Sequence, residues 1–404
     1  MAKKELPRPR NREEAKALRE RQQLLKEKEK ESYELARGPI DLPFLLLVLL
    51  LTGIGLVMLL SASFPSAYYI NSDPTHYFVR QGVFAVAGIC IMLFIGRFNY
   101  QRLRMFAKPL LYFAIILLLL VLIPGIGRTE NNATRWLGLG DLFTFQPSEI
   151  AKLAVVVYFS NSISKKKDKM NTTRYGVLPY LLILGVISVL MLMEPHLSGT
   201  VLIVGTGAVL MLVGGINWAW VLAAIAGVAG VATLMFTGVI TYGQSRIAMW
   251  HDPWIDAQGD GYQLVQSLLS IGSGGLLGVG LGKSRQKFLY LPEEHNDFIF
   301  AIVCEELGLI GATIIMLLFA ALILRGYWIA LHARDRFGSL LVVGFTTLIA
   351  LQTFLNIGVV TGLLPTTGIS LPFFSYGGTA LIIQLAEMGV ILSVSRQMKP
   401  TKAG

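Results

Sequence analysis

The chain has 404 residues, of which 54% are hydrophobic and 15% are charged, and 20 of its 60 charges lie in residues 1–38. The remainder is too apolar for a series of soluble domains, and two cysteines, Cys90 and Cys304, offer neither a disulfide framework nor zinc-ligand spacing. The net charge of +10 does not require nucleic acid as a partner, because basic cytoplasmic loops of a membrane protein account for it.

Residues 1–40 form a charged N-terminal tail that we expect to lie in the cytoplasm. Its NREEAKALRERQQLLKEKEKE stretch has helix formers with Glu and Lys at i,i+3 and i,i+4 spacings. We expect a solvated arm, partly helical or disordered, and recruitment of a partner is the alternative. The apolar segment that follows is too long for the core of a cleavable signal peptide.

Ten apolar segments follow the tail, and the first, PFLLLVLLLTGIGLVMLLSAS, is long enough to cross about 30 Å of hydrocarbon as a helix. The predicted spans are 43–62, 79–96, 108–124, 146–163, 176–194, 197–214, 217–240, 296–325, 338–361 and 376–395. The sequence therefore predicts an all-α, polytopic integral membrane protein with about ten transmembrane helices. Its membrane domain would occupy 41–396, with a large extracytoplasmic loop at 241–295 between helices 7 and 8 and a cytoplasmic tail at 397–404.

Basic loops orient these spans. The tail, RFNYQRLR (97–104), SKKKDK (164–169), HARDR (332–336) and SRQMKPTK (395–402) fall on one side, so both termini are expected in the cytoplasm. Basic residues also occur in the loops of the other side: Arg128, Arg135, Arg246, Lys283, Arg285 and Lys287. Either chance places them there or they hold an anionic ligand. Because nucleotides are scarce outside the cell, a lipid-linked phosphate is the better candidate.

The stretch FQPSEIAK (145–152) brings two opposite charges into the fourth span. Glu149 and Lys152 are three residues apart and so lie on one helix face. A lone charge at mid-membrane costs about 2.5–3.5 kcal/mol, which pairing reduces. The pair is a functional candidate, and a purely structural ion pair is the alternative.

An outer loop, WHDPWIDAQGDGYQ (250–263), is the most polar interruption of the apolar chain. Its Pro and Gly residues argue against a regular helix for Asp252, Asp256 and Asp260, which are four apart. A carboxylate beside aromatic rings can act as a general base. The alternatives are a solvated loop anchored by tryptophans, and a metal site that includes His251, for which the spacing is unspecific.

The segment 272–308 combines a glycine run with buried acids. GSGGLLGVGLGKS (272–284) lacks the glycine that a phosphate-binding P-loop needs, so we expect a flexible or re-entrant segment that approaches a ligand closely. Downstream, Asp297 lies near the outer boundary, and Glu305 and Glu306 lie deeper, where they require partners or a water-filled cavity. The Pro- and Gly-rich turn 361–378 likewise indicates a buried or cavity-lining segment.

In this order the motifs resemble the SEDS family, the FtsW/RodA/SpoVE peptidoglycan polymerases, over roughly 43–395. The resemblance rests on NATRW…FQPSEIAKL (132–153), EPHLSGT (194–200), DPWIDAQGDGYQLVQS (252–267), GLGKSRQKFLYLPEEHNDFIFAIVCEELG (280–308) and GLLPTTGISLPFFSYGG (362–378). The EPHLSG and GKSRQKFLYLPE stretches look closer to the cell-division branch than to the elongation branch, and a sporulation or elongation paralogue is the alternative.

The resemblance implies an inverting glycosyltransferase that polymerises lipid II on the outer face of the bacterial cytoplasmic membrane. Its essential loop aspartate falls on Asp256, although Ala257 stands where proline is usual. The family's acidic and basic positions fall on Glu149, Lys152 and Asp297. Arg135, Arg246, Lys283 and Lys152 are our weaker candidates for neutralising the pyrophosphate. A divalent cation, Mg²⁺ or Mn²⁺, is left open as a cofactor.

The resemblance also implies partners: a class B penicillin-binding protein as transpeptidase, other divisome membrane proteins, membrane lipid and no nucleic acid. Two other functions stay open. A lipid II flippase would use the same intramembrane charges and helix breaks, but it needs access from both faces, whereas the unusual loops here face outward. A non-catalytic divisome scaffold gives no reason for an outer carboxylate beside basic residues.

Overall fold

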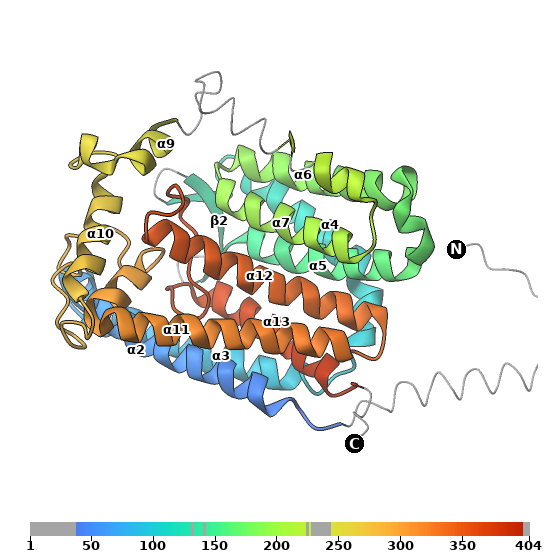
Figure 1. Cartoon of the computed structure of the whole chain (residues 1–404), viewed down its shortest axis with the longest axis horizontal. Helices are drawn as coiled ribbons and strands as arrows, with labels where there is room; N and C mark the ends of the chain where they lie inside the picture. The colour runs from blue at the N-terminus through green and yellow to red at the C-terminus, as the bar shows by residue number, and fades with distance from the viewer. Residues whose placement is uncertain (1–37, 131–132, 140–142, 224–225, 228–243, 399–404) are drawn as a thin grey trace, which may run out of the picture.

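Long apolar helices build the molecule (Figure 1), and this computed structural model describes residues 38–130, 133–139, 143–223, 226–227 and 244–398. Within these residues, seven helical segments are long and apolar enough to cross a membrane. They are α2 (Leu42–Asn71), α3 (His76–Ile95), η1 with α4 (Tyr100–Arg102 and Leu103–Val121), η3 with α6 (Thr173–Val177 and Leu178–Met193), α11 (Ile299–His332), α12 (Arg336–Val360) and α13 (Gly378–Ser395). The prediction of an all-α polytopic membrane protein is confirmed.

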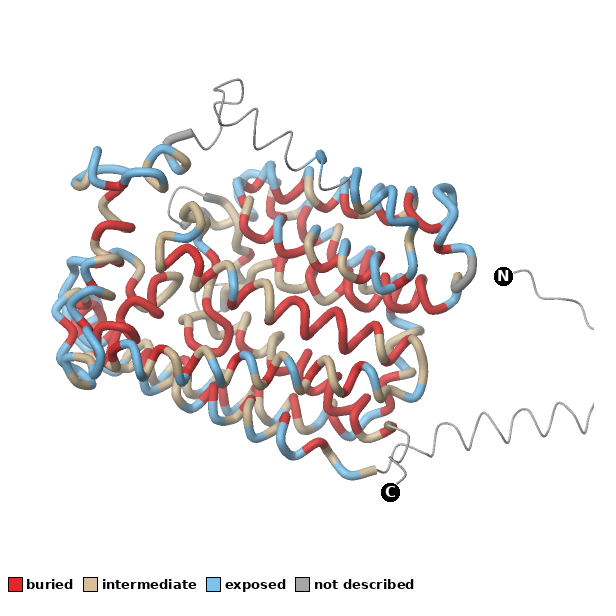
Figure 2. The backbone as a smooth tube through the Cα atoms, viewed as in Figure 1, coloured by how far each residue is buried: buried red, intermediate tan, exposed pale blue. Residues whose placement is uncertain are grey.

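Two further helices match predicted spans. α5 (Pro147–Lys166) is followed by η2 (Lys167–Asn171), and α7 (Leu197–Val213) is a shorter apolar helix. The span expected at 217–240 lies largely outside the described residues. α12 is the central helix: 72% of its most apolar window is buried, against 22% for α3 (Figure 2).

α2 extends well beyond the predicted 43–62. Asp41 begins it as an N-cap, its Oδ1 accepting from the backbone N–H of Phe44 at 3.0 Å. The prediction ended the span at small polar residues, but Ser61, Ser63 and Ser66 are buried and the helix runs on to Asn71. In the sequence, these serines suggested the end of a membrane span, whereas in the structure they face other helices inside the bundle.

A small antiparallel sheet replaces the irregular loop that we expected at 125–145. β1 (Gly127–Glu130), β2 (Ala133–Leu139) and β3 (Phe143–Phe145) pair in the order β1-β2-β3, with Arg128 opposite Trp136 and Leu137 opposite Phe145. Short alternating runs separated by Asn-Asn and Gly-Asp are a hairpin signal, which the apolar surroundings obscured. The sheet leads directly into the first turn of α5.

α11 breaks at Gly308, whose φ of 67° and ψ of −171° no helix contains. The break leaves carbonyl groups of α11 without helical hydrogen bonds, and the glycine run supplies donors for them. The N–H groups of Val279 and Gly280 donate to the carbonyls of Glu305 and Glu306 at 3.0 and 3.1 Å. A Cβ on Gly278 would lie 2.1 Å from the carbonyl oxygen of Glu306. The close approach predicted for this run is therefore made to α11 itself.

The two glutamates beside the break bond to the same run. The Glu306 carboxylate accepts from Lys287 Nζ at 2.9 Å and from Ser61 Oγ of α2 at 2.7 Å. Glu305 accepts from the Arg285 N–H at 2.9 Å and from Ser284 Oγ. Lys287 is thus the basic partner that the sequence did not identify, and it is buried. We call this network the α11 clamp.

The segment that carries Asp256 stands at one end of the bundle. α9 (Gln244–His251), η4 (Pro253–Asp256) and α10 (Tyr262–Gly274) lie there, and the start of α2 and the end of α13 lie at the opposite end (Figure 1). At that opposite end, the Arg396 Nε donates to the carbonyl of Gly38 at 2.9 Å. Residues 1–37 of the expected tail lie outside the described residues.

Candidate functional site

A cavity of about 640 Å³ is lined by α3, β2, α5, α7, α13 and the turns before α11 and α13; we call it the large cavity. Helices α3, α5, α7 and α13 all begin at its wall, with His76, Ser148, Ser198 and Thr379 in or next to their first turns. The N-terminus of a helix carries free N–H groups and a partial positive charge. Four such termini make the cavity favourable for an anion.

Three cationic side chains add to this field. Arg80, Arg135 and Lys152 all line the large cavity. Arg135 extends from β2, and its Nε donates to the carbonyl of Glu194 at 3.2 Å, while its second N–H group bonds the carbonyl of Pro195. Arg80 escaped the sequence analysis, although a cation at the outer edge of a predicted span contradicts the positive-inside pattern and could have marked it.

Lys152 and Glu149 form the ion pair that their spacing predicts. The Lys152 Nζ lies 2.7 Å from the Glu149 carboxylate, and their side chains are 7% and 16% exposed. Pro147 opens α5 where its missing N–H costs nothing, which sets both side chains one turn inside the helix. The pair borders the large cavity, so Lys152 has an anion-binding space on one side.

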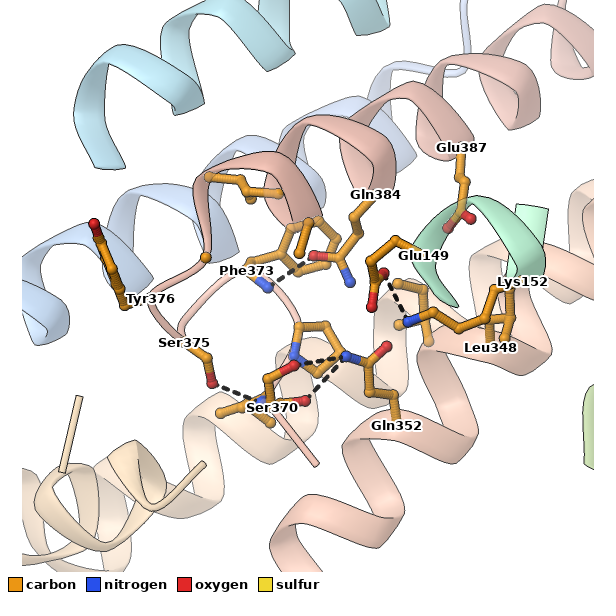
Figure 3. A pocket seen from close by; sticks show the side chains of 16 residues that line it. Glu149, Lys152, Leu348, Gln352, Ser370, Phe373, Ser375, Tyr376, Gln384 and Glu387 are labelled. Carbon is orange, nitrogen blue, oxygen red and sulfur yellow. Dashed lines mark hydrogen bonds and ion pairs between the residues drawn. The ribbon is translucent and has the colours of Figure 1, made fainter. Parts of the chain in front are cut away.

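A second, small cavity of about 30 Å³ lies behind this pair (Figure 3). Glu387 of α13 lines it and is 5% exposed, and two amide side chains that anchor the turn after α12 line it as well. Gln352 Nε2 donates to the Ser370 carbonyl at 3.1 Å, and Gln384 Oε1 accepts from the Phe373 N–H at 3.0 Å. The sequence analysis missed Glu387, although a carboxylate inside an apolar run is a signal for function.

The EPH turn between α6 and α7 contributes two buried titratable groups. Burial raises the pKa of Glu194 to about 8, although the positive charge of Arg135 opposes this shift, and neither carboxylate oxygen has a hydrogen-bond partner among the described residues. Burial, with the charges of Arg135 and Lys152, lowers the pKa of His196 to about 3. His196 therefore faces the cavity as a neutral ring, with Nδ1 3.3 Å from Gln146 Nε2.

Asp297 also lies in the wall of the large cavity. Its backbone carbonyl accepts from Asn356 Nδ2 at 2.7 Å, which fixes the turn before α11. Burial and the neighbouring charge of Glu293 raise the pKa of Asp297 to about 7. Near neutral pH this carboxyl group can therefore either donate or accept a proton.

The remaining predicted residues are not in the cavity lining. Asp256 is exposed at the end of η4, and its Oδ2 accepts from the Asp260 N–H at 3.0 Å. Lys283 is exposed beside the α11 clamp, and Arg246 is exposed on α9. The structure thus brings together Arg135, Glu149, Lys152 and Asp297, and it places Asp256, Arg246 and Lys283 outside that group.

Two bonds connect the Asp256 segment to the cavity wall. The Trp250 Nε1 donates to the carbonyl of Gly362 at 2.9 Å, and Arg246 donates to the carbonyl of Thr366 at 3.4 Å. Both acceptors belong to the turn after α12, whose residues from Gly368 onward line the large cavity. Arg246 therefore positions the loop by a backbone bond here, and Trp250 acts as the anchor.

Comparison with known proteins decides the family. A family model described as "Cell cycle protein", FtsW/RodA/SpoVE, matches residues 42–400. The chain belongs to the FtsW/RodA/SpoVE family. Stage V sporulation protein E of Bacillus subtilis is 44% identical over 88% of this chain and 97% of its own length. A probable peptidoglycan glycosyltransferase FtsW of Geobacter sulfurreducens is 42% identical over 89% and 96%.

Solved structures of the FtsW/RodA/SpoVE family share this fold. A chain from a structure described as "Structural coordination of polymerization and crosslinking by a peptidoglycan synthase complex" aligns with a TM-score of 0.74 at 28% identity, covering 89% of this chain and 98% of that one. The rod shape determining protein RodA of Thermus thermophilus aligns with a TM-score of 0.66 at 27% identity, covering 90% and 99%. The resemblance expected from the motifs is confirmed.

Proposed function

We propose that this chain is a peptidoglycan glycosyltransferase that polymerises lipid II into β-1,4 glycan strands on the outer face of the bacterial cytoplasmic membrane. Two relatives that match 89% of this chain are each named a probable peptidoglycan glycosyltransferase FtsW. The observation that supports it in this molecule is the large cavity, where four helix N-termini converge and three cations line the wall beside the carboxylates of Glu149, Glu293 and Asp297. Such a site suits a pyrophosphate better than a neutral ligand.

The reaction joins two lipid-linked disaccharides. The GlcNAc 4-hydroxyl oxygen of the acceptor forms a bond to the anomeric carbon of the donor, and the bond from that carbon to the pyrophosphate oxygen breaks. The hydroxyl proton goes to a base, and undecaprenyl pyrophosphate leaves with the electron pair. Because the α-linked donor gives a β-linked product, the step inverts, and one base suffices.

Charge on the leaving pyrophosphate is the main demand of this step. Lys152 and Arg135 are held at the cavity wall by bonds to Glu149 and to the Glu194 carbonyl, so they can meet it without reorganising. Arg246 and Lys283 would act at the rim, on lipid headgroups or the peptide. Asp297, whose pKa burial raises to about 7, would bond a sugar hydroxyl from the wall.

Asp256 would serve as the base. It is exposed, so lipid II can reach it, and α9 connects its loop to the turn that lines the cavity. Movement of the 250–263 loop toward the cavity would bring the Asp256 carboxylate and the acceptor hydroxyl together. A divalent cation, Mg²⁺ or Mn²⁺, remains a prediction: the described residues contain no group of three metal-ligating side chains, and Glu293 and Asp297 are wall carboxylates that would hold one with the pyrophosphate.

We further propose cell division as the process served, with a class B penicillin-binding protein as transpeptidase partner, other divisome membrane proteins as neighbours and both termini in the cytoplasm. The structural relative from a peptidoglycan synthase complex supports a partner of this kind. The basic loops support the orientation. Sporulation and division proteins are both among the relatives, so the process itself needs a genetic test.

Polymerisation of purified lipid II in liposomes, with and without the transpeptidase, tests the function. Glycan strands in either reaction would establish the polymerase. Lipid II that crosses the bilayer without polymerising would instead establish a flippase. If neither occurs while the chain still recruits division proteins, it is a scaffold.

A further inference from the structure

A third hollow lies at the end of α3 opposite to the large cavity. α3 begins with His76 at the large cavity and ends at Ile95, which lines this hollow. Its volume is about 360 Å³, and its walls come from α3, α4, α5 and α13. We call it the α3–α4 groove. The proposed glycosyl transfer makes no use of it.

The walls of the α3–α4 groove are apolar and face outward. Phe94, Phe98 and Phe106 are 62%, 41% and 56% exposed, and Leu153 and Val390 line its inner side. Along α4 the groove runs from Leu103 to Leu110, two turns or about 10 Å of helix. On the surface of a membrane-spanning bundle, an apolar groove of this shape suits part of an acyl chain.

Cations lie at the end of this groove where the chain turns between α3 and α4. Arg102 lines it and is exposed, and Arg97 is exposed at the same turn. Among the described residues, neither guanidinium makes a hydrogen bond or ion pair. Their neighbour Arg104 differs, because it bonds Asp335 at 2.7 Å and packs on the Phe337 ring. The rim thus has two cations that no carboxylate of the described part of the chain neutralises.

We propose that the α3–α4 groove binds an anionic glycerophospholipid. One acyl chain lies against Phe94, Phe106 and Leu110, and the headgroup phosphate accepts from Arg102, with Arg97 adding charge nearby. Basic pockets between helices on the cytoplasmic side of a membrane bind anionic headgroups in this way. The basic 97–104 loop is expected on that side. The inference is independent of the proposed catalytic function.

Native mass spectrometry of the detergent-purified full chain tests this. Dioleoyl phosphatidylglycerol and dioleoyl phosphatidylcholine differ in headgroup charge and share their acyl chains. We expect the wild type to retain phosphatidylglycerol preferentially, and Arg102→Gln to weaken that binding about fivefold. Ala386→Phe, which fills the groove from α13, should abolish binding of either lipid at this site.

A matched control separates the groove from general surface charge. Arg174 is an exposed arginine in η3, lying over the Tyr175 ring, so Arg174→Gln removes the same charge away from the groove. Equal weakening in both arginine variants would overturn the proposal, as would wild-type binding that ignores the headgroup. Preferential retention of undecaprenyl phosphate over phosphatidylglycerol would overturn it too, because an isoprenoid would then be the occupant.

Discussion

At the level of single residues, the aspartates of 250–263 differ in what their carboxylates bond. Asp252 caps η4, its Oδ1 accepting from the Trp254 N–H at 3.1 Å. Among the described residues, the Asp256 carboxylate accepts one hydrogen bond, from the Asp260 N–H, and Gly259 leaves it space, since a Cβ there would lie 2.2 Å from its Oδ2. Both carboxylates are exposed and each accepts one backbone N–H, so it is the family position, and not the bonding, that singles out Asp256.

Asp256→Asn should reduce polymerisation of lipid II at least a hundredfold, because the amide cannot accept the acceptor's proton. Asp252→Asn should keep near-normal activity, because asparagine is as good an N-cap as aspartate. Initial rates of strand synthesis by the two purified variants provide the comparison. Equal activities would remove Asp256 from the role of base.

Lys152 is paired with the partly exposed Glu149, and the buried Glu387 lines the same small cavity. Lys152→Met leaves both without their cation and should lower the free energy of unfolding by about 3–5 kcal/mol. The triple variant Glu149→Gln, Lys152→Met, Glu387→Gln has no buried charge in this cluster, so we expect it to recover most of that loss. Thermal unfolding in detergent measures both.

The same triple variant separates the contribution of Lys152 to stability from its contribution to activity. If Lys152 contacts the pyrophosphate, the restabilised variant stays inactive with lipid II. A triple variant with normal activity would show that the pair serves stability alone.

Glu194 should make stability depend on pH. Its pKa is about 8 in the folded protein against an ordinary 4.5, so the folded state holds the proton more tightly. The resulting stabilisation is complete below about pH 4.5 and is lost as the pH rises towards 8. Glu194→Gln stays neutral, so its melting temperature should fall less between pH 5 and 8 than that of the wild type. Parallel curves would contradict the assignment; His196 affects both proteins equally.

At the level of elements, the broken α11 and the glycine run behave as one unit. Gly278→Ala places a Cβ against the Glu306 carbonyl at a φ of +78°, and it should destabilise the protein by roughly 1–3 kcal/mol. A Cβ added to Gly272, inside α10, would meet nothing within 4 Å, so Gly272→Ala should stabilise by about 0.5–1 kcal/mol. Denaturation in mixed micelles checks the opposite signs. If both variants destabilise equally, the clamp does not depend on close backbone approach.

At the level of the whole molecule, the two ends of the bundle should face opposite compartments. In a background with Cys90→Ala and Cys304→Ala, a membrane-impermeant maleimide should label Gln258→Cys in intact spheroplasts. Asn171→Cys, exposed between α5 and α6, should react only after the membrane is opened. The reverse pattern would invert the topology and move the proposed reaction to the cytoplasm.

Hydropathy predicted the bundle because membrane spans are long and strongly apolar, and the ion pair of Glu149 with Lys152 followed from helical spacing. The partners of Glu305 and Glu306 did not, since Lys287 and Ser61 reach them only through the tertiary fold. The β1–β3 sheet was missed because a hydropathy reading treats any segment between spans as loop. Glu387 and Arg80 each had a local signal that was overlooked, but no local pattern shows that helices far apart in the chain bring them to the cavities.

The α11 clamp also has a consequence for biogenesis. Glu305 and Glu306 would each oppose insertion of α11 into the bilayer by about 2.5–3.5 kcal/mol if they entered alone. Their partners Ser61, Ser270, Ser284 and Lys287 all precede them in the chain, so the ribosome delivers these groups first. The ion pair of Glu306 with Lys287 and the serine hydrogen bonds to both glutamates can therefore form as α11 emerges. Because the partners are synthesised first, neither carboxylate has to enter the bilayer without a hydrogen-bond partner.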